Sequence, residues 1–275
     1  MRLCPAIALA LLAAAPAAAS QTEWQEVAPG VRLRLIADDV RRPDGTTMVG
    51  LEIDMPENTK TYWRVPGETG IATELDIAGS TGIAGFTMLW PYPLVDQSAG
   101  YLDYVYYGPT VLPIALDLTG ESAVLQASVT LGVCSDVCVP AMAEFSLPLS
   151  FGTPDAGQQI RLSQAVALTP LPWTGSSPPV GAVSLDAAAD ALAVVLADPE
   201  VDPHSLIADM GPGGTLFGAP QKSPDGKVVF LPLLGGSDPE GLMGQPVQFT
   251  FMTPMGAFEI SRVIDSATAA LAMAR

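Results

Sequence analysis

The stretch GVCSDVCVP at residues 132–140 decides the fold, because it places two cysteines four residues apart. Four residues of extended strand span about 13 Å, whereas the Cα atoms of a disulfide lie within about 7 Å of each other. If Cys134 and Cys138 are bonded, the chain must therefore bend between them. Alternating apolar residues on both sides, at 127–131 and 144–149, predict two strands that form a hairpin through the residues between the cysteines.

Pro140 indicates where this hairpin lies in a sheet. It has no N–H to donate to a neighbouring strand, so it places the second strand at a sheet edge or marks its first residue. Opposed residues of paired strands lie about 4.5–5.5 Å apart, a separation that suits a disulfide. We therefore expect the cysteines to face each other near the hairpin tip.

The first 19 residues are typical of a secretory signal peptide. Arg2 precedes an apolar run at 6–15, and the small residues at 17–19 suit a cleavage site. Cys4 would leave with this leader, so the mature protein would keep two cysteines in an oxidising compartment. No later apolar run approaches the roughly 20 residues that span a bilayer. The sequence predicts an exported protein that does not span the membrane, periplasmic if the source is Gram-negative.

Acidic residues dominate the composition, and the formal net charge of the 275-residue chain is −17. No Lys, Arg or His occurs between Arg64 and Arg161. Proteins that bind nucleic acid cluster basic side chains on one face, so this distribution argues against a nucleic-acid partner. A solvated acidic surface explains the charge, and an acidic docking face for a partner protein is the alternative.

The rest of the chain divides into two β-rich regions. Short strand-like segments separated by Gly and Pro fill residues 20–151, as in antiparallel sandwiches. Residues 152–179 start with helical residue types and end in a Pro, Gly and Ser run that should break regular structure, which predicts a short helix and a linker. Strand patterns return at 180–265, and 266–275 is predicted to be a tail. We predict an all-β protein of two sandwich domains joined by a helix-containing linker.

The cysteine pair admits three uses. A structural disulfide is the simplest, but so short a loop removes little entropy from the unfolded chain, which favours a redox role. In that role Asp136 disfavours a thiolate, and no basic residue is near in the sequence, although Lys60 or Arg64 could lie near in space. We therefore expect the pair to be attacked by a partner's thiolate more often than it attacks. A soft-metal site is the third use, because two thiolates bind Cu(I) or zinc.

The segment CSDVCVPA at 134–141 resembles the active-site segment of the N-terminal domain of the DsbD and ScsB type of periplasmic thiol–disulfide interchange proteins. PMGAFE at 254–259 is similar to the second region of the ScsB-like branch. Three upstream pieces are similar to that branch in the same order and spacing: KTYWRVPGETG at 60–70, LWP at 89–91 and VLP at 111–113.

This resemblance implies two immunoglobulin-like domains and no cofactor besides a redox-active disulfide. The protein would be a thiol–disulfide oxidoreductase of the protein-disulfide reductase kind, passing electrons to exported thioredoxin-fold partners. Cys138 would form the mixed disulfide with a partner, and Cys134 would resolve it. Because the chain contains no membrane conduit and no thioredoxin-like domain, its membrane or thioredoxin-like electron donor would be a separate polypeptide.

The resemblance also implies a loop that caps the disulfide, which corresponds to residues 94–101. The chain departs from DsbD itself here, because the DsbD cysteine spacing is wider and its cap carries an aromatic residue, whereas residues 97–100 read QSAG. Trp63, Tyr101 and Tyr104 are the candidates to shield the pair, although each also suits a hydrophobic core.

Two alternatives to the redox relay remain open. CSDVC is also similar to the copper site of Sco-type copper chaperones, which would make Cys134, Cys138 and Met142 a Cu(I) site. Those chaperones have a thioredoxin fold and a distant histidine ligand, whereas here a strand pattern follows the cysteines and the single histidine, His204, lies in a turn-like stretch. In the second alternative, the protein is a non-catalytic binding or assembly module.

Overall fold

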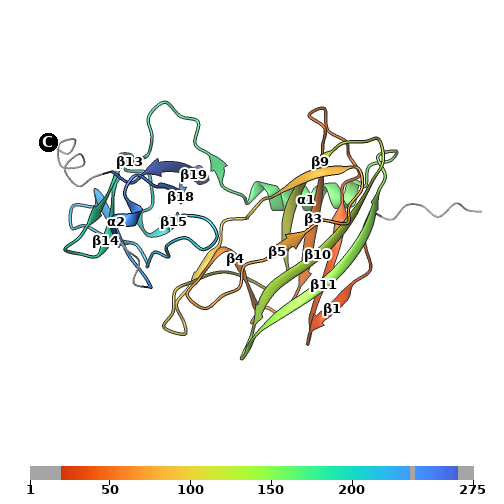
Figure 1. The fold of residues 1–275 in the computed structure, drawn as a ribbon, viewed down its shortest axis with the longest axis horizontal. Helices are drawn as coiled ribbons and strands as arrows, with labels where there is room; N and C mark the ends of the chain where they lie inside the picture. Colours follow the sequence, from red (N-terminus) through yellow and green to blue (C-terminus); the bar gives the residue numbers. More distant parts are fainter. Residues whose placement is uncertain (1–19, 236–238, 266–275) are drawn as a thin grey trace, which may run out of the picture.

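The computed structural model describes residues 20–235 and 239–265, and it is mostly β-structure, as predicted. Figure 1 shows two β-rich lobes, one drawn in red to green and the other in blue tones. The predicted signal peptide, with Cys4, and the predicted tail lie outside the described residues. The division into two domains stays a prediction, and the lobes are described below by their sheets and cores.

The first lobe is a sandwich of two sheets. Its first sheet, within the described residues, has five strands in the order β1 (Gln25–Ala28), β2 (Val31–Ala37), β3 (Thr46–Asp54), β9 (Thr110–Leu118) and β6 (Ile83–Met88). Its second sheet has the order β11 (Cys138–Leu149), β10 (Ala123–Cys134), β4 (Lys60–Gly67), β8 (Asp103–Tyr107) and β7 (Leu94–Asp96), with β5 (Glu74–Asp76) on β10.

Alternation along the strands explains why the two sheets pack together. In β2, for example, Leu33 and Leu35 are fully buried while Arg32 is exposed, because neighbouring residues of a strand point to opposite faces. Leu33 and Leu51 from the first sheet share one core cluster with Leu125 from the second. The hydrophobic core of this lobe therefore lies between its two sheets.

The second lobe repeats this plan with its own hydrophobic cluster, which includes Val194 and Phe249. One sheet has the order β12 (Leu171–Pro172), β19 (Gly256–Val263), β18 (Pro246–Thr253) and β15 (Ile207–Asp209). The other has the order β13 (Val180–Asp186), β14 (Ala191–Leu196), β17 (Val228–Pro232) and β16 (Gln221–Lys222). A short 3-10 helix, η1 (Pro203–Ser205), and α2 (Pro239–Leu242) lie in the connections.

The helix predicted after the first lobe is present as α1 (Ala156–Ala167) and contacts the first sheet. The Asp155 side chain begins it by accepting hydrogen bonds from the N–H groups of Gly157 and Gln158. The expectation that no regular structure follows is wrong at β12, which pairs in parallel with β19. The pairing is possible there because only two residues are involved, and the N–H of Trp173, not that of a proline, donates to the carbonyl oxygen of Glu259.

The predicted cysteine hairpin is present in full. β10 and β11 pair antiparallel along their whole length, and Cys134 lies opposite Cys138. β11 is an edge strand of its sheet, the place that Pro140 indicated. Odd-numbered residues such as Leu131 face the core, so the two even-numbered cysteines belong to the outer face of the sheet.

Candidate redox site

Cys134 and Cys138 form a disulfide at the tip of this hairpin, with their Cα atoms 4.1 Å apart. The two cysteines differ in access to solvent. Cys134 is 2% exposed, whereas Cys138 is an exposed residue. A partner's thiolate can therefore approach the sulfur of Cys138 more readily than that of Cys134.

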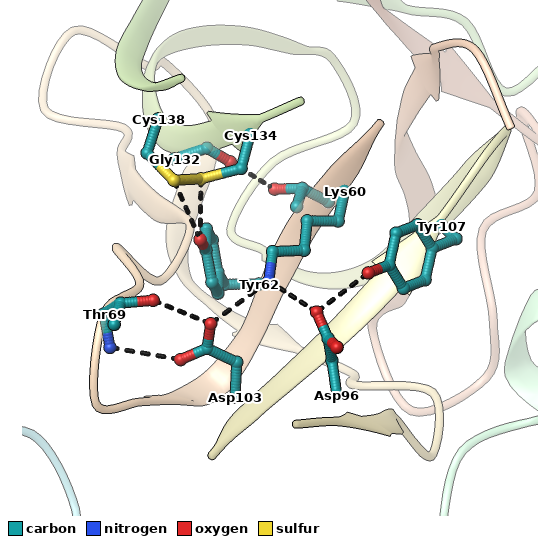
Figure 2. Close-up of a disulfide and its surroundings, with 10 residues drawn as sticks. Lys60, Tyr62, Thr69, Asp96, Asp103, Tyr107, Gly132, Cys134 and Cys138 are labelled. Atoms are coloured by element: carbon teal, nitrogen blue, oxygen red, sulfur yellow. Dashed lines mark hydrogen bonds and ion pairs between the residues drawn. A yellow bond between two sulfur atoms is a disulfide. The ribbon is translucent and has the colours of Figure 1, made fainter. Parts of the chain in front are cut away.

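Tyr62, on β4, contacts the disulfide directly (Figure 2). Its hydroxyl oxygen lies 2.7 Å from Sγ of Cys134 and 3.5 Å from Sγ of Cys138. Tyr62 is 1% exposed, and it forms a small buried cluster with Cys134 and Val105, apart from the main core. Burial raises the pKa of Tyr62, so the phenol keeps its proton at neutral pH.

Two glycines make room for the ring of Tyr62. A Cβ atom at Gly132 would lie 3.0 Å from Cδ2 of Tyr62, and one at Gly70 would lie 2.1 Å from Cδ1. The chain at Ile71 approaches from the same side, where its carbonyl oxygen accepts a hydrogen bond from Gly132 N–H at 3.1 Å. The ring is thus held between β10 and the segment at 70–71, with its hydroxyl directed at the sulfurs.

Lys60 lies opposite Cys134 on the neighbouring strand β4. Its Nζ lies 2.6 Å from Oδ2 of Asp96 and 3.2 Å from Oδ2 of Asp103, and Figure 2 shows it directed at these carboxylates. Burial acts to lower the pKa of Lys60, but the hydrogen bonds to Asp96 and Asp103 raise it above its usual value. Of the two cations that the sequence offered, Lys60 lies next to Cys134 in the sheet, but its positive charge is paired with two negative charges.

Asp96 anchors the segment that corresponds to the family's cap. Burial acts to raise the pKa of Asp96, but hydrogen bonds from Lys60, Ser98 and Tyr107 hold it well below its usual value. Asp96 ends β7, which pairs with β8, and it also fixes the following turn by accepting from the N–H of Ser98 at 2.9 Å. The start of the 94–101 segment is thus attached to the strand that carries Tyr62.

The three predicted shielding residues lie in different places. Trp63 is fully buried in the main core and packs edge-to-face on Tyr104, with ring centroids 6.0 Å apart. Both therefore take the core role that the sequence left open for them. Tyr101 is 53% exposed, and its role stays a prediction. The structure places Tyr62 against the sulfurs instead, because adjacent strand residues face opposite ways and Trp63 takes the inward side.

The residues of the copper alternative are not gathered in one place. Met142 lies four residues beyond Cys138 on β11, about 13 Å along an extended strand, and it is 73% exposed. His204 belongs to η1 in the second lobe. The geometry therefore does not bring Met142 to the two sulfurs as a third soft ligand.

The second cation considered near the site, Arg64, has partners in the other lobe. Its guanidinium lies 2.8 Å from Oδ2 of Asp209, 3.2 Å from Oε2 of Glu259 and 3.0 Å from Oγ1 of Thr250. β4 therefore carries two neighbours of the disulfide, Lys60 and Tyr62, and, at Arg64, a contact between the lobes. Among the described helices, none is long and apolar enough to cross a membrane.

A disulfide at the tip of an edge hairpin, with one exposed and one buried sulfur, is an arrangement suited to thiol–disulfide exchange. Comparison with known proteins agrees with this class. Residues 33–150 match the family described as thiol:disulfide interchange protein DsbD, N-terminal. This part of the chain is therefore a DsbD/ScsB-type N-terminal domain, as the sequence motifs indicated.

The crystal structure of the N-terminal periplasmic domain of ScsB from Proteus mirabilis is similar to this protein, with a TM-score of 0.68 and 26% sequence identity. The match covers 90% of this chain and 99% of that chain, so it includes both lobes. No curated protein matches the chain.

Proposed function

We propose that this protein is a periplasmic thiol–disulfide interchange protein that relays reducing equivalents through Cys134 and Cys138. The observation that carries the proposal is the asymmetry of the two sulfurs within a DsbD-type domain. Cys138 is exposed at the hairpin tip, and Cys134 is buried beside Tyr62. Two cysteines so arranged provide one sulfur for a partner and one that stays within the protein.

The relay has a reductive half and a delivery half. In the first, a donor thiolate attacks Sγ of Cys138, a donor–Cys138 bond forms, and the electron pair of the broken disulfide goes to Sγ of Cys134. The donor's second thiolate then attacks the donor sulfur of this mixed disulfide and releases Cys138. In the second half, the Cys138 thiolate attacks a partner's disulfide, and the Cys134 thiolate resolves the resulting mixed disulfide, which restores the original bond.

The charges around the site support a pair that is mainly attacked. Lys60 is bound to two carboxylates, and Asp136 follows Cys134 by two residues, so the surroundings do not favour a free thiolate. An external donor must then supply the first nucleophile. We assign this role to a separate membrane or thioredoxin-like protein, and the role of client to exported thioredoxin-fold proteins.

The remaining features of the proposal concern the scaffold. The two lobes are two immunoglobulin-like domains, and the second serves as structure or as a docking surface. No cofactor takes part besides the disulfide. The signal peptide predicted in the first 19 residues supports a periplasmic location, and so does the match to a periplasmic domain.

Trapping of mixed disulfides tests this function. A Cys134→Ala variant, expressed in the periplasm, should accumulate covalent complexes of thioredoxin-fold proteins with Cys138, because the resolving thiol is missing. Cys138→Ala is the matched control and should trap none of them. Recovery of no thioredoxin-fold partner, together with tight Cu(I) binding by the wild type, would favour the copper alternative instead.

A further inference from the structure

We propose that Tyr62 is a catalytic residue of this exchange, which donates a hydrogen bond to the sulfur of Cys134 when the disulfide opens. The inference rests on the proposed function, and it adds a residue that neither the cysteine motif nor the predicted shielding set contains. It depends on the contact between the Tyr62 hydroxyl and Cys134 Sγ, at 2.7 Å.

The difference in solvent exposure between the two sulfurs determines which of them gains negative charge when the disulfide opens. Attack at the exposed Cys138 leaves the electron pair on Cys134, which is buried. A thiolate taken out of water is costly unless a hydrogen-bond donor faces it. The Tyr62 hydroxyl is nearer to the leaving sulfur of Cys134 than to the attacked sulfur of Cys138, where the separation is 3.5 Å. The donor is therefore closer to the atom that gains charge.

The charged groups nearby do not perform this task. Lys60 is the ammonium next to Cys134 in the sheet, but Asp96 and Asp103 hold it. These three groups together carry one net negative charge, which opposes a thiolate. Tyr62 is a neutral donor, and because burial raises its pKa it donates a hydrogen bond without losing the proton. No proton transfer is needed, since a thiolate enters and a thiolate leaves.

The ring is positioned before the reaction begins. Gly132 and Gly70 leave space for it on both sides, so the hydroxyl has little freedom to turn away from the sulfurs. A donor fixed in place stabilises developing charge without reorganisation during the step. The same hydrogen bond favours the Cys134 thiolate in the reverse direction, when Cys134 resolves a mixed disulfide.

A Tyr62→Phe variant tests the role. Two quantities are measured: the rate at which dithiothreitol opens the disulfide of the oxidised protein, and the pKa of the Cys134 thiol in a Cys138→Ser background, followed by thiolate absorbance. We expect the rate to fall about tenfold and the pKa of Cys134 to rise by about one unit. A hydrogen bond to a charged group stabilises it by enough to change a rate or an acid dissociation constant at least about tenfold. A purely structural role of the ring would move neither quantity.

Tyr106→Phe is the matched control. It removes the hydroxyl of another buried tyrosine, which donates to the carbonyl of Pro91 and not to a sulfur. In this variant, the rate of disulfide opening and the pKa of the Cys134 thiol should equal those of the wild type. If Tyr62→Phe fails to fold, Gly70→Ala is the second variant, because its Cβ displaces the Tyr62 ring and should slow the opening as well.

The outcomes separate this inference from the proposed function. If Tyr62→Phe opens at the wild-type rate with an unchanged Cys134 pKa, the role of Tyr62 is overturned while the relay stands. If the wild-type disulfide resists dithiothreitol and Cys134→Ala traps no partner, the relay itself is wrong.

Discussion

The hairpin of β10 and β11 in the first lobe and the hairpin of β18 and β19 in the second end differently. β10 and β11 close on the disulfide, which the hydroxyl of Tyr62 contacts. β18 and β19 close on a tight turn, where Met255 is 72% exposed. Regular strand pairing is common to both, so the architecture by itself supplies no chemistry. The first hairpin gains its chemistry from a cysteine on each strand and from the phenol that β4 brings to them.

The Tyr62 ring beside the disulfide packs closely against Gly132. A larger side chain at position 132 should therefore have the largest effect of the changes considered. Gly132→Val would place a side chain 3.0 Å or less from the Tyr62 ring and from the carbonyl oxygen of Ile71. We expect a loss of about 1–3 kcal/mol in the free energy of unfolding, measured with urea, and slower opening of the disulfide. Gly152→Val is the control, since no atom lies within 4 Å of its Cβ position. Equal stability of the two variants would contradict the packing described here.

Ion pairs of Lys60 with Asp96 and Asp103 lie beside the first hairpin, and they predict a dependence of stability on pH. The lowered pKa of Asp96 means that its ionised form stabilises the folded protein. This contribution is complete above the unfolded pKa of about 4 and is lost as the pH falls below it towards the folded value. Asp96→Asn should lower the free energy of unfolding by about 2 kcal/mol at neutral pH.

Urea unfolding at several pH values checks this. Between about pH 5 and about pH 3, the wild type should lose more stability than Asp96→Asn, because the variant lacks the titrating group. Asp76→Asn, at an exposed position on β5, is the control and should keep the wild-type pH profile. An Asp96→Asn profile parallel to that of the wild type would show that the ion pair contributes nothing.

The smallest effect is expected where β4 meets the second lobe. Arg64→Ala removes contacts to Asp209, Glu259 and Thr250, and we expect a loss of about 1 kcal/mol in the free energy of unfolding. The rate of disulfide opening should not change, because Arg64 contacts the other lobe rather than the sulfurs. Arg32→Ala, which breaks an exposed ion pair with Asp54, should lower the free energy of unfolding by less than Arg64→Ala does. A slowed opening in Arg64→Ala would show that the lobes are coupled through β4.

The hairpin itself could be predicted because its information is local. The spacing of the two cysteines requires a bend, alternation on both sides defines strands, and Pro140 selects an edge. All of these features lie within 30 residues of one another. The short pairing of β12 with β19 was missed, since it joins segments far apart in the chain.

The surroundings of the disulfide could be predicted only in part. Lys60 was recognised as a possible neighbour, but Asp96 and Asp103 were not, because their contact with it depends on which strands pair. Alternation shows that Tyr62 and Trp63 point to opposite faces, yet it does not show which face is the core. That choice is set by the pairing of β4 with β8 and β10, more than 30 residues away.

The site of attack on the disulfide tests the central claim most directly. Oxidised wild-type protein is mixed with reduced glutathione, quenched with acid and alkylated, and the cysteine that carries glutathione is identified by peptide mass spectrometry. We predict that glutathione is attached to Cys138 and that Cys134 is alkylated, because only the former sulfur belongs to an exposed residue. Equal attachment to both cysteines, or attachment mainly to Cys134, would contradict the account.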